Sequence, residues 1–274
     1  MTTVAVPATS TGLARGPSSL GRVRWAVADT LTITKRNLLA YLRIPESLFF
    51  STVQPIMFVL LFTYVFGGAI HVPGLSYVNY LMPGVFVQTV AFGAVSTSIG
   101  LAEDLQKGII ERFRALPMSR SAVLTGRTSA DTVRNVCTVV IITAVGLAVG
   151  FRPSTGVLTY LAAIGVILLF AYALSWGFAT IGLSAPNSET AQVMSFPLLF
   201  PLIFASSAFV PVASMPSWLR GFATYQPVSV VVDACRALML GGPTAKWVLQ
   251  SVAWALGLLL VLVPLAVRRY RTRI

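Results

Sequence analysis

Five long stretches of this chain contain no Asp, Glu, Lys or Arg, and they limit the fold more than any other feature. They are residues 47–102, 135–151, 153–188, 190–219 and 247–267. A helix needs about 20 apolar residues to cross the hydrocarbon core of a bilayer. The stretches are continuously apolar, whereas the strands of a membrane β-barrel alternate apolar and polar residues. The sequence therefore predicts an all-α integral membrane protein.

The amino-acid composition points the same way. Hydrophobic residues make up 56% of the chain and charged residues 10%, against roughly 25% charged in an average soluble domain. So few charged side chains cannot cover the surface of a soluble enzyme of this size. The net charge of +12 would suggest nucleic-acid binding in a soluble protein. Here the basic residues flank apolar stretches, so we expect membrane lipid, and no nucleic acid, beside them.

The lengths of the stretches predict the number of spans. Residues 47–102 are long enough for two spans joined by a turn at 71–74. We predict six transmembrane helices, near residues 48–69, 78–101, 128–150, 157–183, 190–210 and 246–267. An amphipathic pattern over 24–44 predicts a helix that lies in the headgroup layer, and residues 1–23 are predicted to form a mobile cytoplasmic tail. Residues 24–274 are then expected to form a single transmembrane domain.

Basic residues predict the orientation of these spans. Six spans place both termini on the same side. Sixteen of the 20 Lys and Arg residues lie in the N-terminal part, at the junction of the second and third spans, and in the C-terminal tail. Lys and Arg are concentrated in cytoplasmic loops, so both termini are expected in the cytoplasm.

Motifs for catalysis and for nucleotide binding are absent from the sequence. The three lysines, Lys35, Lys107 and Lys246, are not followed by Ser or Thr, so the chain lacks a phosphate-binding P-loop. With His71 as the single histidine and two cysteines, a closed zinc site has too few ligands. We predict no catalytic, cofactor or metal site on this chain. Asp131 and Asp233 are the acids within or beside spans, which disfavours a proton-driven pump without excluding it.

Asp131 and Arg134 are three residues apart at the start of the third predicted span, so they are expected to pair at the membrane interface. The preceding loop has a helical pattern of its own over 103–117. Its apolar stripe is formed by Leu105, Ile109, Phe113 and Leu116, and its charged rim includes Glu111, Arg112 and Arg114. Such a helix fits the groove of a partner protein, or alternatively rests on lipid headgroups.

A second distinctive region precedes the last predicted span. Prolines interrupt it, and aromatic residues typical of membrane interfaces recur in it. The residues singled out are Pro211, Trp218, Tyr225 and Pro227. They predict re-entrant or interfacial helices on the outer side, with an ordinary external loop as the alternative.

Two segments carry a resemblance to a known family. Residues 111–131, ERFRALPMSRSAVLTGRTSAD, and residues 209–242, FVPVASMPSWLRGFATYQPVSVVVDACRALMLGG, are similar to type-2 ABC exporter permeases of the daunorubicin-resistance subfamily. The resemblance implies a multi-pass protein of the bacterial plasma membrane, with a separate ATPase subunit bound at the 103–117 helix. It also implies two ATPase subunits, which would hold ATP and Mg²⁺, and a second permease chain, identical or related. Export of drugs, antibiotics, polyketides or lipids is the implied activity.

Three classes of function remain compatible with the sequence. The favoured one is the membrane subunit of an ATP-driven exporter, which is not itself an enzyme. The alternative is a standalone proton-driven secondary transporter. A membrane-embedded enzyme or an assembly factor is the third, and an enzyme would need a polar cluster that we do not find in the sequence.

Overall fold

The computed structural model describes residues 19–43, 45–70, 72, 74–114 and 120–273. Every regular element in these ranges is helical. The elements are α1 (Ser19–Arg43), α2 (Pro45–Leu61), the π-helix η1 (Phe62–Phe66), α3 (Tyr77–Gln106), α4 (Ile109–Arg114), α5 (Arg120–Val149), α6 (Val157–Ser184), α7 (Ser188–Phe204), the 3₁₀ turn η2 (Val212–Ser214), α8 (Ser217–Tyr225), α9 (Pro227–Leu240) and α10 (Thr244–Arg273). The helix predicted over 24–44 thus begins earlier, at Ser19, inside the segment predicted as a mobile tail. The rest of that tail, residues 1–18, lies outside the described residues.

The described part of the chain has four helices that are long and apolar enough to cross a membrane. They are α3, α5 from Ala122, α6, and α10 to Thr272. The regions predicted as the first and fifth spans are also helical, but α2 and α7 have 17 residues each and contain prolines. Four of the six predicted spans therefore meet this length and composition test, and the count of six stays a prediction.

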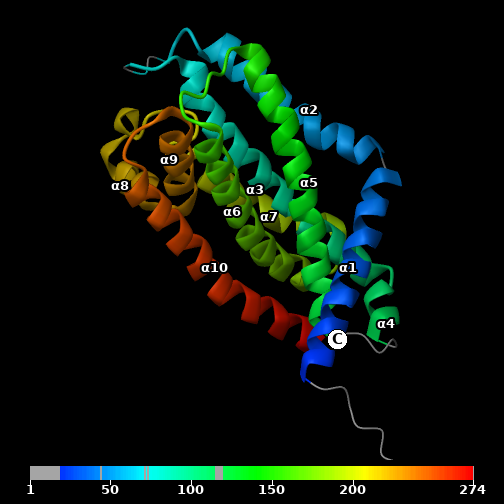
Figure 1. Cartoon of the computed structure of the whole chain (residues 1–274). Helices are drawn as coiled ribbons and strands as arrows, with labels where there is room; N and C mark the ends of the chain where they lie inside the picture. The colour runs from blue at the N-terminus through cyan, green and yellow to red at the C-terminus, as the bar shows by residue number, and fades with distance from the viewer. Residues whose placement is uncertain (1–18, 44, 71, 73, 115–119, 274) are drawn as a thin grey trace, which may run out of the picture.

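Helix α3 is the centre of the bundle, with α5, α6, α7 and α9 packed around it (Figure 1). Its side chains are buried along most of its length. Small residues allow the close packing of α3 against α6, because a Cβ atom at Gly182 would lie 2.3 Å from the Ser98 carbonyl oxygen. Close contact through small residues is the usual way in which membrane helices associate. By contrast, α10 is peripheral and exposes Leu249, Leu260 and Val261.

The bundle has two chemically different ends. The start of α1, the short helix α4 and the end of α10 lie at one end, whereas α8 and α9 lie at the other (Figure 1). We call these the α4 end and the α9 end. Several basic residues belong to the segments at this end: Arg112 lies on α4, Lys107 directly follows α3, Arg268 and Arg269 lie near the end of α10, and Arg36 of α1 pairs with Asp104 near the end of α3.

Local sequence explains how the segments at the α9 end begin and stop. Pro227 occupies the first turn of α9, where a missing backbone N–H is tolerated, and the Gln226 side chain accepts a hydrogen bond from the Val228 N–H at 3.3 Å. The helix ends at Gly241, whose φ of +91° favours glycine. As predicted from the prolines, this region forms short helices, and α9 is largely buried against α3, α6 and α10.

Candidate functional site

The segment predicted as one helix over 103–117 is broken in the structure. Helix α3 runs on to Gln106, and α4 begins at Ile109. Between them Gly108 has a φ of +64°, a conformation that other residues rarely adopt. Lys107 caps the end of α3 and pairs with Glu103 at 2.5 Å, and this hydrogen bond raises the pKa of Lys107. The prediction of one continuous helix is therefore wrong, because the glycine turns the chain after α3.

The break changes how α4 is held. Leu105 belongs to α3, Ile109 is half-buried, and Ile110, which was not part of the predicted stripe, is 1% exposed. Ile110 packs in a cluster with Val123 and Leu124 of α5 and Tyr270 of α10. Several helices therefore fix α4 at this end of the bundle.

The remaining residues predicted to bind an ATPase are only partly described. Glu111 and Arg112 lie on α4 and are exposed. Phe113 and Arg114 also belong to α4, but their side chains are outside the described part of the structure, as is all of Leu116. Their role at an ATPase interface stays a prediction.

Asp104 ties α1 to α3 and α5 just before the break. Its carboxylate is 3.1 Å from Arg36 of α1 and 3.5 Å from Arg127 of α5. Arg127 also donates to the Ser96 carbonyl oxygen of α3 at 3.3 Å. Asp104 is 9% exposed, so removing either arginine would leave a largely buried carboxylate with fewer partners.

Asp131 forms a second, fully buried link between the same helices. It is 0% exposed and accepts hydrogen bonds from Thr97 of α3 and from Tyr41 of α1, the latter at 2.5 Å. Burial, and then the negative charge of Asp131, raise the pKa of Tyr41 to about 12. The phenol therefore stays protonated and acts as the donor to this carboxylate.

Arg134 pairs with Asp131 and also lines a cavity. The ion pair predicted from the spacing is present, with Arg134 3.6 Å from Asp131, and both side chains are buried. Arg134 also lies over the Tyr41 ring at 5.1 Å and donates to the Gly93 carbonyl oxygen at 2.6 Å. The same guanidinium group is part of the cavity wall.

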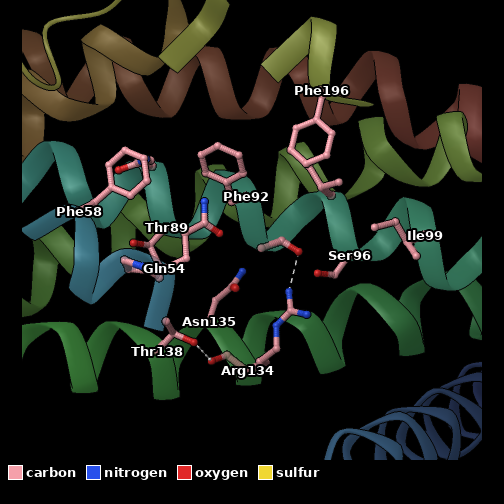
Figure 2. A pocket seen from close by; sticks show the side chains of 14 residues that line it. Gln54, Phe58, Thr89, Phe92, Ser96, Ile99, Arg134, Asn135, Thr138 and Phe196 are labelled. Carbon is pink, nitrogen blue, oxygen red and sulfur yellow. Dashed lines mark hydrogen bonds between the residues drawn. The ribbon is translucent and has the colours of Figure 1, made fainter. Parts of the chain in front are cut away.

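The cavity has a volume of about 230 Å³ and lies between α2, α3, α5 and α7. Figure 2 shows phenylalanine rings along one side and the polar side chains of Arg134, Asn135 and Thr138 on the α5 side. Gln88 and Thr89 of α3 also line it. The Gln88 Oε1, Thr89 Oγ1 and Asn135 Nδ2 atoms are buried, and no described residue forms a hydrogen bond with them. Such groups are costly when unpaired, so the cavity suits a molecule that brings hydrogen-bond partners.

Ion pairs also hold the α9 end together. Asp233 accepts from Arg236 at 2.6 Å and from Ser207 at 2.9 Å. Arg236 donates to the carbonyl oxygens of Ser207 and Tyr80 and lies 3.8 Å over the Tyr80 ring. Helix α9 is thereby fixed to α3 and to the segment that follows α7.

The residues predicted for an outer gate do not form one cluster. Trp218 and Tyr225 on α8 are 79% and 71% exposed. Pro211 precedes η2 and Pro227 begins α9, and both are half-buried. Their role in gating stays a prediction.

The structure brings together several residues that the sequence patterns did not single out. Tyr41, Asp104 and Ile110 gave no specific signal, because their partners are distant in the sequence. Gln88 and Asn135 could have been found, since both are polar side chains inside uncharged stretches, and such residues in membrane spans usually have a function.

Together, the four long apolar helices and the buried polar links between them define a multi-pass helical membrane protein. A model of the family "ABC-2 type transporter" matches residues 28–240. The chain therefore belongs to the ABC-2 type transporter family, which confirms the resemblance found in the sequence.

Two relatives cover nearly the whole chain. The daunorubicin resistance ABC transporter permease protein DrrB1 of Streptomyces coeruleorubidus is 35% identical over 248 residues, which cover 90% of this chain and 88% of the relative. A probable doxorubicin resistance ABC transporter permease protein, DrrC of Mycobacterium tuberculosis, is 30% identical over 262 residues, with 92% of each chain covered. A putative transport permease of Porphyra purpurea, ycf38, is 24% identical over 214 residues, 77% of this chain and 73% of the relative. These relatives are permease subunits, which are transport components and not enzymes.

Proposed function

We propose that this chain is the membrane-spanning subunit of an ATP-driven exporter of hydrophobic or amphipathic molecules. A separate ATPase subunit binds at α4 and carries ATP and Mg²⁺, and two permease chains, identical or related, pair with two ATPase subunits. The complex resides in a bacterial plasma membrane with both termini in the cytoplasm. The basic residues on α4 and near the end of α10 support this orientation.

One observation carries the proposal, namely the polar linkage between the α4 end and the cavity. Asp104 ties α1 to α3 and α5 three residues before Lys107. Tyr41 then connects α1 to Asp131 and Arg134, and Arg134 reaches the cavity wall. A displacement of α4 is transmitted through this linkage to the helices that surround the cavity.

The proposed coupling follows from the way α4 is mounted. Glu111 and Arg112 are exposed, whereas Ile110 is anchored among α5 and α10. When ATP binding brings the ATPase subunits together, a push on α4 moves α1, α3 and α5 as packed units. Packed interfaces of this kind switch between discrete arrangements, which alternately open the cavity to the two sides of the membrane.

The relatives support the substrate class. Their names assign them to daunorubicin and doxorubicin resistance, so we infer that a drug-like or antibiotic molecule is the cargo. The apolar and polar walls of the cavity suit an amphipathic molecule.

A standalone proton-driven transporter is the alternative. It would need an acid that takes up and releases protons within the membrane. The two candidates, Asp131 and Asp233, are each paired with an arginine on the same helix, and both carboxylates also accept hydrogen bonds from neighbouring hydroxyl groups. This arrangement suits structural ion pairs better than proton carriers.

Reconstitution in proteoliposomes tests the proposal. The purified chain alone should hydrolyse no ATP above background. Together with its cognate ATPase it should export an amphipathic dye in an ATP-dependent manner, and a protonophore should leave this export unchanged. Dye export by the chain alone, driven by a proton gradient, would instead establish the proton-driven alternative.

A further inference from the structure

A second cavity lies at the α9 end, and it shares no lining residue with the cavity between α2, α3, α5 and α7. Its volume is about 530 Å³. Four parts of the chain form its walls, namely the start of α3 with Asn79, the loop between α5 and α6 with Arg152, helix α9 with Asp233 and Arg236, and the start of α10 with Trp247. We call it the second cavity.

The second cavity lies at the level where three long apolar helices begin. Asn79 is in the first turn of α3, Arg152 shortly precedes α6, and Trp247 is in the first turn of α10. Tryptophan and basic side chains at the ends of membrane spans lie among the lipid headgroups. The cavity is therefore at the depth of the headgroups in the leaflet at the α9 end.

Positive charge gathers at the second cavity. The topology predicted from the sequence leaves four basic residues on this side of the membrane, Arg152, Arg220, Arg236 and Lys246. Arg152 and Arg236 line the cavity, and Lys246 Nζ lies 4.9 Å from the centroid of the Trp247 ring, which lines it too. Basic residues are sparse on the side opposite the cytoplasm. Three of the four at one cavity therefore point to an anionic ligand.

Two of these cations are available to a ligand. Arg236 is paired with Asp233 at 2.6 Å, whereas neither Arg152 nor Lys246 forms an ion pair in the described part of the chain. Arg152 donates through Nη1 to two backbone carbonyl oxygens. Its Nε and Nη2 have no acceptor among the described residues, and arginine donors of this kind bind phosphate.

The carboxylate of Asp233 narrows the chemistry of the ligand. Its Oδ1 accepts hydrogen bonds from Arg236 and Ser207, whereas no described residue donates to its Oδ2. A hydroxyl group can donate to this oxygen, and a second negative charge beside it is unfavourable. The walls thus suit a ligand that carries one phosphate charge and a neighbouring hydroxyl group.

An apolar track leads away from the second cavity along α10. Trp254 and Val261 follow Trp247 at intervals of seven residues, so the three side chains lie on one face of the helix. Trp254 is 42% exposed and Val261 66%. This face suits a hydrocarbon chain, which a soluble phosphate compound lacks.

We propose that the second cavity binds an anionic phospholipid with a hydroxylated headgroup, of the phosphatidylglycerol type, from the leaflet at the α9 end. Its phosphate accepts hydrogen bonds from Arg152 and interacts with Lys246, and a headgroup hydroxyl donates to Asp233. An acyl chain lies along Trp254 and Val261. The lipid joins the α5–α6 loop to α10 and stays bound to the permease instead of being exported, so the proposal does not depend on the proposed function.

Native mass spectrometry of the delipidated permease–ATPase complex, titrated with phosphatidylglycerol, tests the site. The wild-type complex should bind its first phosphatidylglycerol at least about fivefold more tightly than phosphatidylcholine, which has no net charge and no headgroup hydroxyl. Arg152→Gln and Lys246→Gln should each weaken phosphatidylglycerol binding about fivefold, as expected for one basic residue at an anionic headgroup. Neither should change the binding of phosphatidylcholine.

Arg220→Gln is the matched control. Arg220 is an exposed cation on α8 at the same end of the bundle, and it does not line the second cavity. This variant loses the same charge and should keep the affinity of the wild type. Arg152→Lys retains the charge and should bind phosphatidylglycerol more tightly than Arg152→Gln. Lys246→Gln tests the site independently of the Arg152 contacts with the backbone, and thermal stability in lipid-free detergent shows whether each variant is folded.

Two results would overturn the proposal: equal affinity of the wild type for phosphatidylglycerol and phosphatidylcholine, or equal affinity of Lys246→Gln and Arg220→Gln for phosphatidylglycerol. Inorganic phosphate and glycerol 3-phosphate distinguish a lipid from a soluble anion, because they carry the charge without acyl chains. Neither should displace the bound lipid at an equal concentration. Displacement by either one would assign the cavity to a soluble anion and refute lipid binding.

Discussion

The Tyr41–Asp131 hydrogen bond should decide whether ATP hydrolysis is coupled to transport. Tyr41→Phe removes a single hydroxyl group, which donates to a 0% exposed carboxylate at 2.5 Å. Hydrogen bonds to charged groups contribute about 1.5–3 kcal/mol. In this variant Asp131 keeps Thr97 and Arg134 as partners. The lost interaction is therefore confined to the contact between Asp131 and α1.

Thr97→Val is the matched control, because it removes the other hydroxyl donor to Asp131. Thr97 lies on α3, so its loss leaves α1 attached. Both variants should lose a similar free energy of unfolding, measured as thermal stability in detergent. A loss of about 1.5–3 kcal/mol corresponds to tenfold or more in the equilibrium between attached and detached α1.

The assay is the number of substrate molecules exported per ATP hydrolysed by the reconstituted complex. Tyr41→Phe should hydrolyse ATP but export several times less substrate per ATP. Thr97→Val should keep a ratio close to that of the wild type. If the two variants lose stability equally and also show the same ratio, α1 does not transmit movement through Tyr41 and the reasoning is refuted.

Three further outcomes are expected. Gly108→Ala places a Cβ at a φ of +64°, so it should lower the free energy of unfolding by about 1 kcal/mol or more and impair coupling. The control Glu111→Ala, at an exposed position, should leave stability unchanged. Equal stability of the two variants would contradict the argument that the chain needs glycine to turn between α3 and α4. The raised pKa of Tyr41, about 12 against 10.0, predicts that the contribution of Tyr41 to the free energy of unfolding is constant below pH 10 and falls between pH 10 and 12. The difference between wild type and Tyr41→Phe should therefore shrink over that range by at most about 1.4 kcal/mol per pH unit, and a constant difference would contradict it. Arg112→Cys should react with an impermeant thiol reagent only in inside-out vesicles and Ala213→Cys in intact cells, and the reverse labelling would overturn the proposed orientation.

Continuous apolar runs predicted the fold class well because a membrane imposes length and composition on each helix. The ion pair between Asp131 and Arg134 followed from local spacing. The break at Gly108 did not, since the periodicity of Leu105, Ile109 and Phe113 continues across it. Periodicity reports which side chains could share a face and says nothing about where the chain turns.

Long-range partners explain what the sequence could not predict. Tyr41 and Asp131 are 90 residues apart, and no pattern within α1 marks Tyr41 as the donor. The second cavity likewise joins α3, α9 and α10, whose relative positions depend on helix packing. Gln88 and Asn135 were visible as polar residues in apolar stretches, but their shared cavity appears only once the helices are assembled.

Cross-linking at α4 tests most directly whether the ATPase acts on this end of the permease. Glu111→Cys and Trp218→Cys place thiols at exposed positions on α4 and on α8, at opposite ends of the bundle. The background should lack the exposed Cys137, and a thiol-linked photo-cross-linker is attached before the assembled complex is irradiated. We expect a covalent adduct with the ATPase subunit from Glu111→Cys and none from Trp218→Cys. An adduct from Trp218→Cys, or no adduct from Glu111→Cys in a complex that still co-purifies with its ATPase, would contradict coupling through α4.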